Sequence, residues 1–260
     1  GVVRLLESTH AIITVTISMD GLEEDHDRVR GRKGFFKLAM KTIEGLKEIQ
    51  KKYDKLEIVL RHTMLPDNYK DMPKLYALSK ELGIGFTTKP ATSGGLFDND
   101  EEFRMWHDNF SQKQKKEAIQ ILEDIIEDKM KNLDLEKNNL FANIKEVAGV
   151  LFLKYSIKFI NNPMKNVFPC YAYFSSVLLD NEGNVKTCPV LYADLGNVRE
   201  KPFNEIWLNK ESKRIRKFIK KGKCACFTNC NQIPSLVMSE LPKILTIIAK
   251  KKVKRKQRLI

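Results

Sequence analysis

Residues 170–207 read CYAYFSSVLLDNEGNVKTCPVLYADLGNVREKPFNEIW, and residues 224–230 follow with CACFTNC. These two segments hold every cysteine of the chain: Cys170, Cys188, Cys224, Cys226 and Cys230. The first two cysteines flank Gly183 in a Cys-x12-Gly-x4-Cys frame. Thiols that gather in about a quarter of a chain serve either as a disulfide framework or as ligands of a soft metal centre.

The cysteine content favours a metal centre over disulfides. The count of five is odd, the chain is rich in lysine and no secretory signal is recognisable, so we expect a cytoplasmic, reducing setting. Two other interpretations are a Cys-x-Cys redox pair formed by Cys224 and Cys226, and purely structural thiols. Zinc and iron-sulfur clusters both accept four thiolates, and the spacing alone does not choose between them.

The residues between the first two cysteines predict a β-hairpin. A strand is expected from the alternation of Ala172, Phe174, Ser176 and Leu178. Asp180-Asn181-Glu182-Gly183 predicts the turn, and the chain returns through Val185. Because a hairpin brings its two ends together, we expect Cys170 and Cys188 to face one metal centre.

This region resembles the SPASM or twitch domain found at the C-terminal end of radical SAM enzymes. In that family a Cys-x(9–15)-Gly-x4-Cys hairpin, a Gly-Asn-Val step, a short helix ending in Ile-Trp and a late cysteine cluster bind auxiliary 4Fe-4S clusters. Here Gly196-Asn197-Val198 and Ile206-Trp207 match those elements. The cysteines are too few for two clusters, so the resemblance implies a single cluster, the twitch arrangement. It implies Cys170, Cys188 and Cys230 as ligands, with the fourth supplied by Cys224 or Cys226.

The N-terminal third alternates strand patterns with helix patterns. Strands are expected at 11–17, 56–63 and 83–87, and helices at 35–52 and 70–82. The run at 11–17 is almost continuously β-branched, as in strands buried in a parallel sheet. The polar segment 22–34 is expected to be a loop. This order predicts a βαβαβ unit with a parallel sheet and right-handed crossovers.

A second resemblance lies in this part of the chain. Residues 13–49, ITVTISMDGLEEDHDRVRGRKGFFKLAMKTIEGLKEI, are similar to the fourth strand and following helix of the radical SAM partial barrel. The resemblance implies that Ser18 and Arg30 contact the SAM carboxylate or ribose, and that Asp20 and Asn68 line the same mouth. The alternative is structural: Asp20 caps a turn, and Arg30 pairs with Glu23 or Asp25.

The family's signature Cys-x3-Cys-x2-Cys is not found in this sequence, because no cysteine precedes Cys170. We therefore expect the chain, which begins with Gly1, to be the C-terminal portion of a radical SAM oxidoreductase that does not cleave SAM by itself. The complete protein is expected to bind SAM and a second 4Fe-4S cluster. Its expected partners are an electron donor such as ferredoxin or flavodoxin and an unknown substrate, either a peptide or a small molecule.

The expected fold class is α/β, with the C-terminal half of a radical SAM partial (β/α) barrel followed by a small α+β SPASM/twitch domain. Four segments are predicted, namely the partial barrel at 1–91, a helical connection at 92–165, the cluster domain at 166–235 and a basic amphipathic helix at 236–260. His10, His26 and His62 are expected to be packed or surface side chains rather than parts of a site.

The charge of the chain supports a rival interpretation. The formal net charge is +13, and eight of the basic residues lie in 243–258 without an acidic neighbour. The remaining excess of +5 is ordinary for a globular protein. Leu241, Ile244, Leu245 and Ile248 fall on one face of a predicted helix, so the tail could contact an anionic membrane surface or nucleic acid. The rival function is a zinc-stabilised binding module of that kind.

Overall fold

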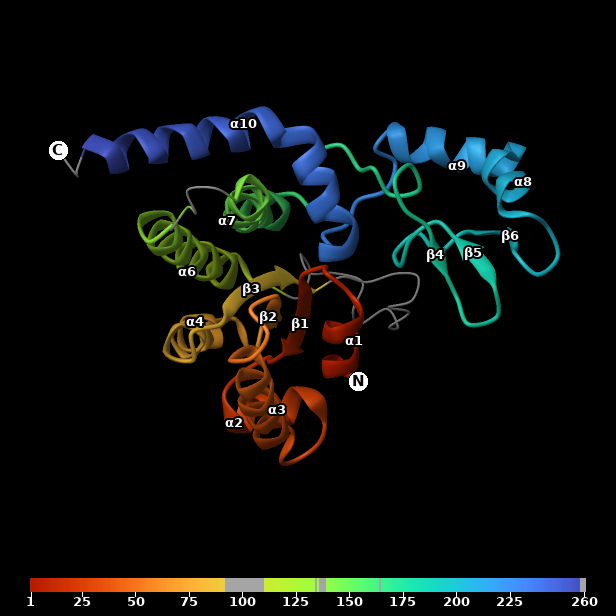
Figure 1. Cartoon of the computed structure of the whole chain (residues 1–260). Coiled ribbons are helices and arrows are strands. Elements are labelled where there is room, and N and C mark those ends of the chain that lie inside the picture. Colours follow the sequence, from red (N-terminus) through yellow and green to blue (C-terminus); the bar gives the residue numbers. More distant parts are fainter. Residues whose placement is uncertain (92–109, 134, 136–138, 164, 258–260) are drawn as a thin grey trace. The chain divides into compact units, whose positions relative to one another are not determined.

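The computed structural model describes residues 1–91, 110–133, 135, 139–163 and 165–257 (Figure 1). The start of the predicted helical connection, 92–109, lies outside the described residues. The chain divides into two compact units. The first unit is Gly1–Pro90 with Lys116–Ile121, and the second is Ala91–Lys115 with Leu122–Ile260. Residues of one long helix, α6 (Gln112–Lys131), therefore belong to both units.

The first unit is built on a parallel sheet in the order β1-β2-β3. Its elements are α1 (Val2–Ser8), β1 (Ile13–Ser18), α2 (Glu23–Arg30), α3 (Phe35–Gln50), β2 (Leu56–Met64), the 3-10 turn η1 (Tyr69–Asp71), α4 (Met72–Glu81) and β3 (Gly85–Pro90). The predicted βαβαβ order is confirmed. Helix α2 is a correction, because it occupies a segment that we predicted to be a loop. Acidic residues in its first turn and Gly31 at its end, with φ of 67°, are favourable helix boundaries.

The two faces of this sheet differ in character. One face carries Ile13, Val15, Leu56 and Ile58, which pack against side chains of α1 and α3. Residues at alternate positions point to the opposite face, which includes Thr14, Thr16, Ser18, Glu57, Thr63 and Thr87. On that face Thr14 Oγ1 donates a hydrogen bond to Glu57 Oε2 at 2.9 Å. The β-branched run that we expected to be buried throughout is thus apolar on one side only, because every second β-branched residue of β1 is a threonine.

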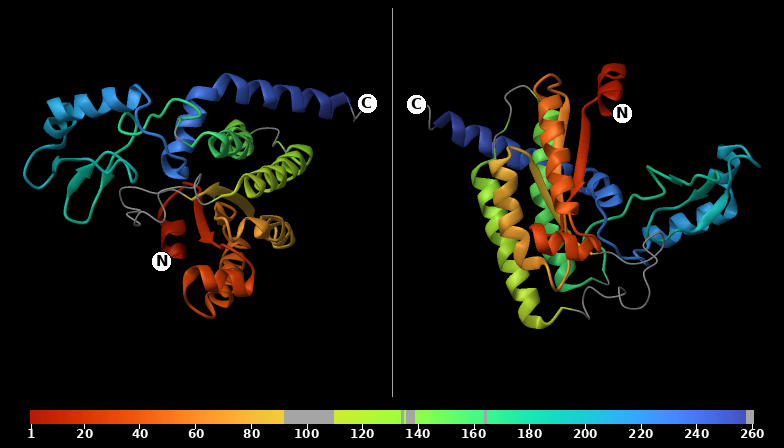
Figure 2. Two further views of the ribbon diagram at one scale, coloured as in Figure 1. Left: turned by 180° about the vertical axis from the view of Figure 1, so that it is seen from behind. Right: turned by 90° about the horizontal axis from the view of Figure 1, so that it is seen from below.

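The second unit combines a helical part with a small antiparallel sheet. Besides most of α6, its elements are α7 (Leu140–Asn161), β4 (Leu178–Leu179), β5 (Asn184–Lys186), β6 (Asp194–Asn197), α8 (Phe203–Leu208), α9 (Lys210–Lys220) and α10 (Asn229–Gln257). The sheet order is β4-β5-β6, and both pairings are antiparallel. The views in Figure 2 show this sheet beside α8 and α9.

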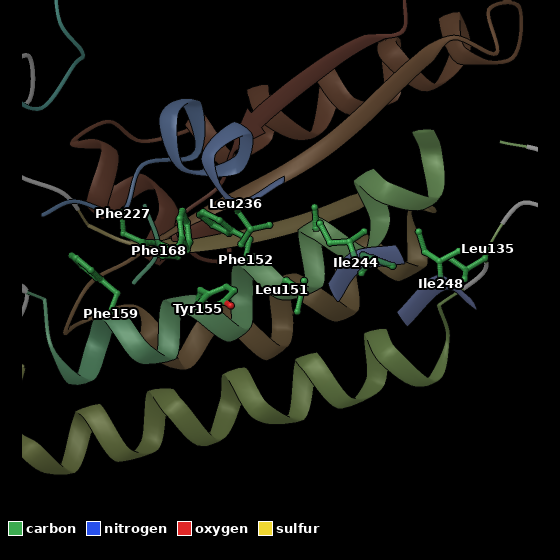
Figure 3. Close-up of a cluster of buried hydrophobic side chains, with 12 residues drawn as sticks. Leu135, Leu151, Phe152, Tyr155, Phe159, Phe168, Phe227, Leu236, Ile244 and Ile248 are labelled. Carbon is green, nitrogen blue, oxygen red and sulfur yellow. The ribbon is translucent and has the colours of Figure 1, made fainter. Parts of the chain in front are cut away.

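Helices α7 and α10 pack along each other and bury an aromatic core (Figure 3). The Phe227 ring stacks on Phe152 at a centroid distance of 4.5 Å and on Phe159 at 5.3 Å. Tyr155 meets Phe168 edge to face at 5.2 Å. Both Phe168 and Phe227 lie outside α7, so the helix holds two other segments of the chain against itself.

The hairpin is shorter than the sequence predicts. Its turn is confirmed at 180–183, where Gly183 has φ of 90°, a conformation that favours glycine. The strands cover only two or three residues each, and Tyr173, predicted within a strand, has φ of 59°. Tyr173 is instead fully buried, with its hydroxyl 2.7 Å from Ser212 Oγ and the Arg216 guanidinium 5.0 Å from its ring. Packing against α9 therefore overrides the strand pattern here.

The C-terminal helix begins earlier than the predicted tail. α10 starts at Asn229 and continues past Pro234 and Pro242, and Figure 1 shows that it bends, as prolines inside a helix cause. Of the predicted apolar stripe, Ile244 and Ile248 are buried against α7, whereas Leu241 and Leu245 are exposed. None of the described helices combines the length and apolarity that crossing a bilayer requires.

Candidate functional site

Two aromatic anchors place the cysteine-bearing segments in the second unit. Phe168 precedes Cys170 by two residues, and Phe227 follows Cys226 directly. Both aromatic side chains are buried in the core formed with α7 (Figure 3). Because neither anchor can move without disrupting that core, the backbone on both sides of the site is held by packing rather than by the hairpin alone.

Hydrogen bonds join the same two segments directly. Asn166 Nδ2 donates to the carbonyl oxygen of Cys224 at 2.6 Å. The backbone N–H of Tyr171 donates to Ser235 Oγ in α10 at 2.9 Å. Residues 166–171 are therefore tied to the late cysteine loop on one side and to the first turns of α10 on the other.

The structure brings four thiols into one neighbourhood, those of Cys170, Cys188, Cys224 and Cys226. None of these four forms a disulfide. Burial, with smaller contributions from the neighbouring thiols of Cys170 and Cys188, raises the pKa of Cys224 to about 12 and that of Cys226 to about 11. Burial likewise raises the pKa of Cys170, with a contribution from Cys188. The side chain of Cys230 lies outside the described part of the chain.

Several groups donate hydrogen bonds to these sulfur atoms. The backbone N–H of Leu191 donates to Cys188 Sγ at 3.3 Å, and Gln232 Nε2 donates to Cys226 Sγ at 3.4 Å. Asn229 is buried, and its amide nitrogen and oxygen have no partner among the described residues. Cysteine sulfur atoms that accept N–H donors, next to an amide without a partner among the described residues, fit a thiolate-bound iron-sulfur cluster. Within the described residues, no three His, Cys, Asp or Glu side chains are grouped to hold a metal ion.

A second site lies in the first unit, where β1 and β2 end. Arg30 donates to Asp20 Oδ2 at 2.7 Å, and the backbone N–H of Thr63 donates to Asp20 Oδ1 at 3.0 Å. Asn68 Nδ2 donates to the carbonyl oxygens of Asp20 and Thr63, at 3.0 Å each, while Asn68 Oδ1 accepts from the N–H of Leu65. Three of the four predicted residues, Asp20, Arg30 and Asn68, thus form one connected network.

This network corrects the structural alternative for Arg30. Arg30 pairs with Asp20, not with Glu23 or Asp25. Glu23 pairs instead with Lys37, and Asp25 pairs with Arg28. The reason is the helical conformation of α2, which the sequence did not predict.

Ser18, the fourth predicted residue, is exposed on the polar face of the sheet. It lies two positions before Asp20 and pairs with Arg61 in the strand register. Gly21 follows Asp20, and a Cβ atom there would lie 2.5 Å from the Cβ of Asp25. The close approach of α2 to this strand end therefore requires glycine.

Two histidines that we expected to be packing or surface residues belong to the same region. His26 Nδ1 accepts a hydrogen bond from the backbone N–H of Asp20 at 3.1 Å, and burial lowers its pKa. His62 is completely buried, its Nδ1 lies 2.9 Å from Thr88 Oγ1, and burial lowers its pKa to about 4. Both rings are therefore neutral at pH 7. The signal for His62 was its position in β2, which alternates buried and half-buried residues.

Comparisons with known proteins found matches to the cysteine region and to most of the chain. A family model described as "SPASM: Iron-sulfur cluster-binding domain" matches residues 170–232. An AdoMet-dependent heme synthase of Methanosarcina barkeri (strain Fusaro / DSM 804) is 26% identical over 220 residues, which cover 81% of this chain and 58% of the relative. A Fe-coproporphyrin III synthase of the same organism is 25% identical over 217 residues, covering 74% and 48%.

A third relative is similar over the cluster region only. The sporulation killing factor maturation protein SkfB of Bacillus subtilis (strain 168) is 53% identical over 36 residues, 14% of this chain and 9% of the relative. Among solved structures, anSMEcpe with bound AdoMet and a Cp18Cys peptide has a TM-score of 0.54 at 14% identity, covering 95% of this chain and 72% of the other.

The match at residues 170–232 is to an iron-sulfur cluster-binding domain, and the fold of the chain is similar to that of anSMEcpe with bound AdoMet. The chain is thus similar to radical SAM proteins, and its residues 170–232 match the SPASM domain. It spans about half the length of the curated relatives that it matches.

Proposed function

We propose that this chain is the C-terminal part of a radical SAM oxidoreductase whose SPASM domain binds one auxiliary 4Fe-4S cluster. The observation that carries the proposal is that the thiols of Cys170 and Cys188 lie near enough to those of Cys224 and Cys226 to raise their pKa values, although 35 residues separate the two segments in the sequence. Cys170, Cys188 and Cys230 are the proposed ligands, with a fourth from Cys224 or Cys226. A bound 4Fe-4S cluster supplies one-electron transfer.

The chain's own groups prepare the site in two ways. Phe168 and Phe227 hold the thiol-bearing segments on α7, and the N–H donors of Leu191 and Gln232 stabilise negative charge on sulfur. Cys188 is buried and Cys226 is partly buried, and the lower local dielectric strengthens these hydrogen bonds. Both effects support a site that binds a cluster and limits its hydrolysis.

In the first unit we propose that Ser18 and Arg30 face SAM. Ser18 is exposed on the polar face of the sheet, and Arg30 keeps 37% of its side chain exposed while it pairs with Asp20. Asp20 and Asn68 are buried and use their polar atoms within the network. Their proposed role is to hold the mouth of the site in position. The cluster that cleaves SAM would be bound by a Cys-x3-Cys-x2-Cys segment outside this chain, so we propose that the chain alone is inactive in cleavage.

The names of the relatives and neighbours support only a broad proposal for the substrate class. Two of them are named for heme and Fe-coproporphyrin III synthesis, and one solved neighbour holds a peptide. We propose a peptide or a small molecule as substrate and a ferredoxin or flavodoxin as electron donor. Contact of the basic tail with a membrane surface or nucleic acid would be weak, because two apolar residues of its stripe, Ile244 and Ile248, are buried against α7.

The test is anaerobic purification with iron and sulfide, followed by assays of iron, sulfide and zinc. We expect about four irons and four sulfides per chain. Cys188→Ser should lose most of the iron, whereas the control Ser176→Ala, at an exposed hairpin position, should keep it. Bound zinc without sulfide would overturn the proposal in favour of the zinc-stabilised module.

A further inference from the structure

Three polar side chains are buried immediately after Cys226, where the loop enters α10. Thr228, Asn229 and Gln232 are exposed by only 2%, 8% and 1%. Buried hydroxyl and amide groups are stable only when they are hydrogen-bonded. The polar atoms of these three side chains therefore need hydrogen-bond partners in or near the cysteine site.

Two of these side chains direct their polar atoms to one sulfur. Gln232 Nε2 donates to Cys226 Sγ at 3.4 Å, and Thr228 Oγ1 lies 4.0 Å from the same sulfur. The spacing explains this, because residues three or four apart share one face of a helix. Cys226 Sγ thus accepts one hydrogen bond from α10 and lies beside the hydroxyl of the residue that precedes this helix.

Cys224 has a different environment. It packs against the apolar cluster between the small antiparallel sheet and helices α8 and α9, which includes Tyr173, Ile206 and Ile219. Its carbonyl oxygen accepts from Asn166. Among the described residues, no side chain donates a hydrogen bond to its sulfur. A thiolate ligand carries negative charge, and the surroundings of Cys226 stabilise that charge better than those of Cys224.

Asn229 supplies an independent observation. It lies between Cys226 and Cys230, and within the described structure neither atom of its buried amide has a hydrogen-bond partner. Such an amide requires a polar partner, and a cluster bound at the neighbouring cysteines offers sulfur acceptors.

We propose that Cys226, rather than Cys224, is the fourth ligand of the cluster. Thr228, Asn229 and Gln232 then donate hydrogen bonds to the sulfur atoms of the cluster and its ligands, and raise the reduction potential of the cluster. This assignment rests on the proposed function. The three polar residues are positioning residues, because they act on the cluster through hydrogen bonds and not as ligands. Donors to sulfur stabilise the reduced, more negative cluster, which is why they raise the potential.

The ligand assignment is tested with Cys224→Ser and Cys226→Ser, a matched pair that differs by two positions. Both variants and the unchanged chain are reconstituted anaerobically, and iron, sulfide and visible absorption are measured. Cys226→Ser should lose most of its iron, and Cys224→Ser should keep about four irons per chain. The reverse result, loss in both or retention in both would overturn the assignment. An unchanged chain without iron would instead overturn the proposed function.

The donor role is tested by redox titration followed by electron paramagnetic resonance. Gln232→Met and Asn229→Leu preserve side-chain size and remove the amide donor, so the midpoint potential should fall while the iron content stays the same. Gln112→Met, at an exposed position at the start of α6, is the control and should leave the potential unchanged. An unchanged potential in both test variants, or loss of iron from both, would overturn the donor role.

Discussion

The two sites of this chain satisfy their polar groups in opposite ways. At the ends of β1 and β2, Asp20 and Asn68 are bonded to each other and to neighbouring backbone groups. In the cysteine site, thiols have strongly raised pKa values and the Asn229 amide has no partner in the described structure. The comparison teaches that Asp20 and Asn68 find their partners within the fold, whereas the Asn229 amide finds none among the described residues, as we expect where a bound group is to supply the partner.

The strongest test of this contrast removes an anchor of the cysteine site. Phe227→Ala deletes a ring that stacks on two others in the α7 core, and should cost about 4 kcal/mol of unfolding free energy. Denaturant unfolding followed by circular dichroism measures the loss. Phe141→Ala, which truncates an exposed ring of α7, is the control and should change little. An equal effect of the two variants would show that Phe227 is not an anchor.

The next test concerns His62, the fully buried histidine of the first unit. Burial lowers the pKa of His62 from 6.5 to about 4, so folding keeps the ring neutral at pH values where the unfolded chain protonates it. Its contribution to stability is full above pH 6.5 and is lost as pH falls towards 4, a change of about 3 kcal/mol.

Unfolding free energies measured between pH 7 and pH 4 check this. His62→Gln should flatten the dependence, and the exposed His10→Gln should retain it. A slope that is the same in all three proteins would contradict the burial of a neutral His62.

Removal of iron should affect the cysteine site and leave the strand-end site unchanged. If the cluster is bound at 100 times its dissociation constant, it stabilises the folded cysteine site by about 2.7 kcal/mol. Hydrogen exchange read by mass spectrometry should then quicken by roughly 100-fold in 170–190 and 224–232 after chelation, and stay unchanged in the strands of the first unit. Equal changes of the exchange rate in both regions would contradict the expectation that only the cysteine site depends on the cluster.

A smaller effect is expected in the strand-end network. Asp20→Ala removes the partner of Arg30 and the acceptor of the Thr63 N–H, and should cost about 2 kcal/mol, since solvent screens the half-exposed Arg30. Asp54→Ala, at an exposed turn, is the control. Thermal unfolding measures both, and the iron content of Asp20→Ala should match that of the unchanged chain. Iron loss in this variant would mean that the two sites depend on each other.

Local patterns were enough to predict much of the first unit. The periods of the strands and helices between residues 11 and 90 predicted the parallel sheet, since side-chain periodicity follows directly from backbone geometry. Helix α2 was missed because its polar sequence has no apolar stripe, and its stability comes from its ends and its tertiary contacts. The hairpin strands were overestimated for the related reason that Tyr173 is packed against α9 instead of a neighbouring strand.

The sequence by itself determined the cysteine frame, the glycine of the turn and the alternation of strand and helix, because each depends on neighbours within a few positions. Only the tertiary structure decided that Arg30 pairs with Asp20, that Phe227 anchors the late cysteine loop, and that Gln232 donates to Cys226. The Arg30–Asp20 pair depends on the folding of α2, and the anchoring of Phe227 depends on its packing against α7. Burial then determines how strongly each polar group needs its partner.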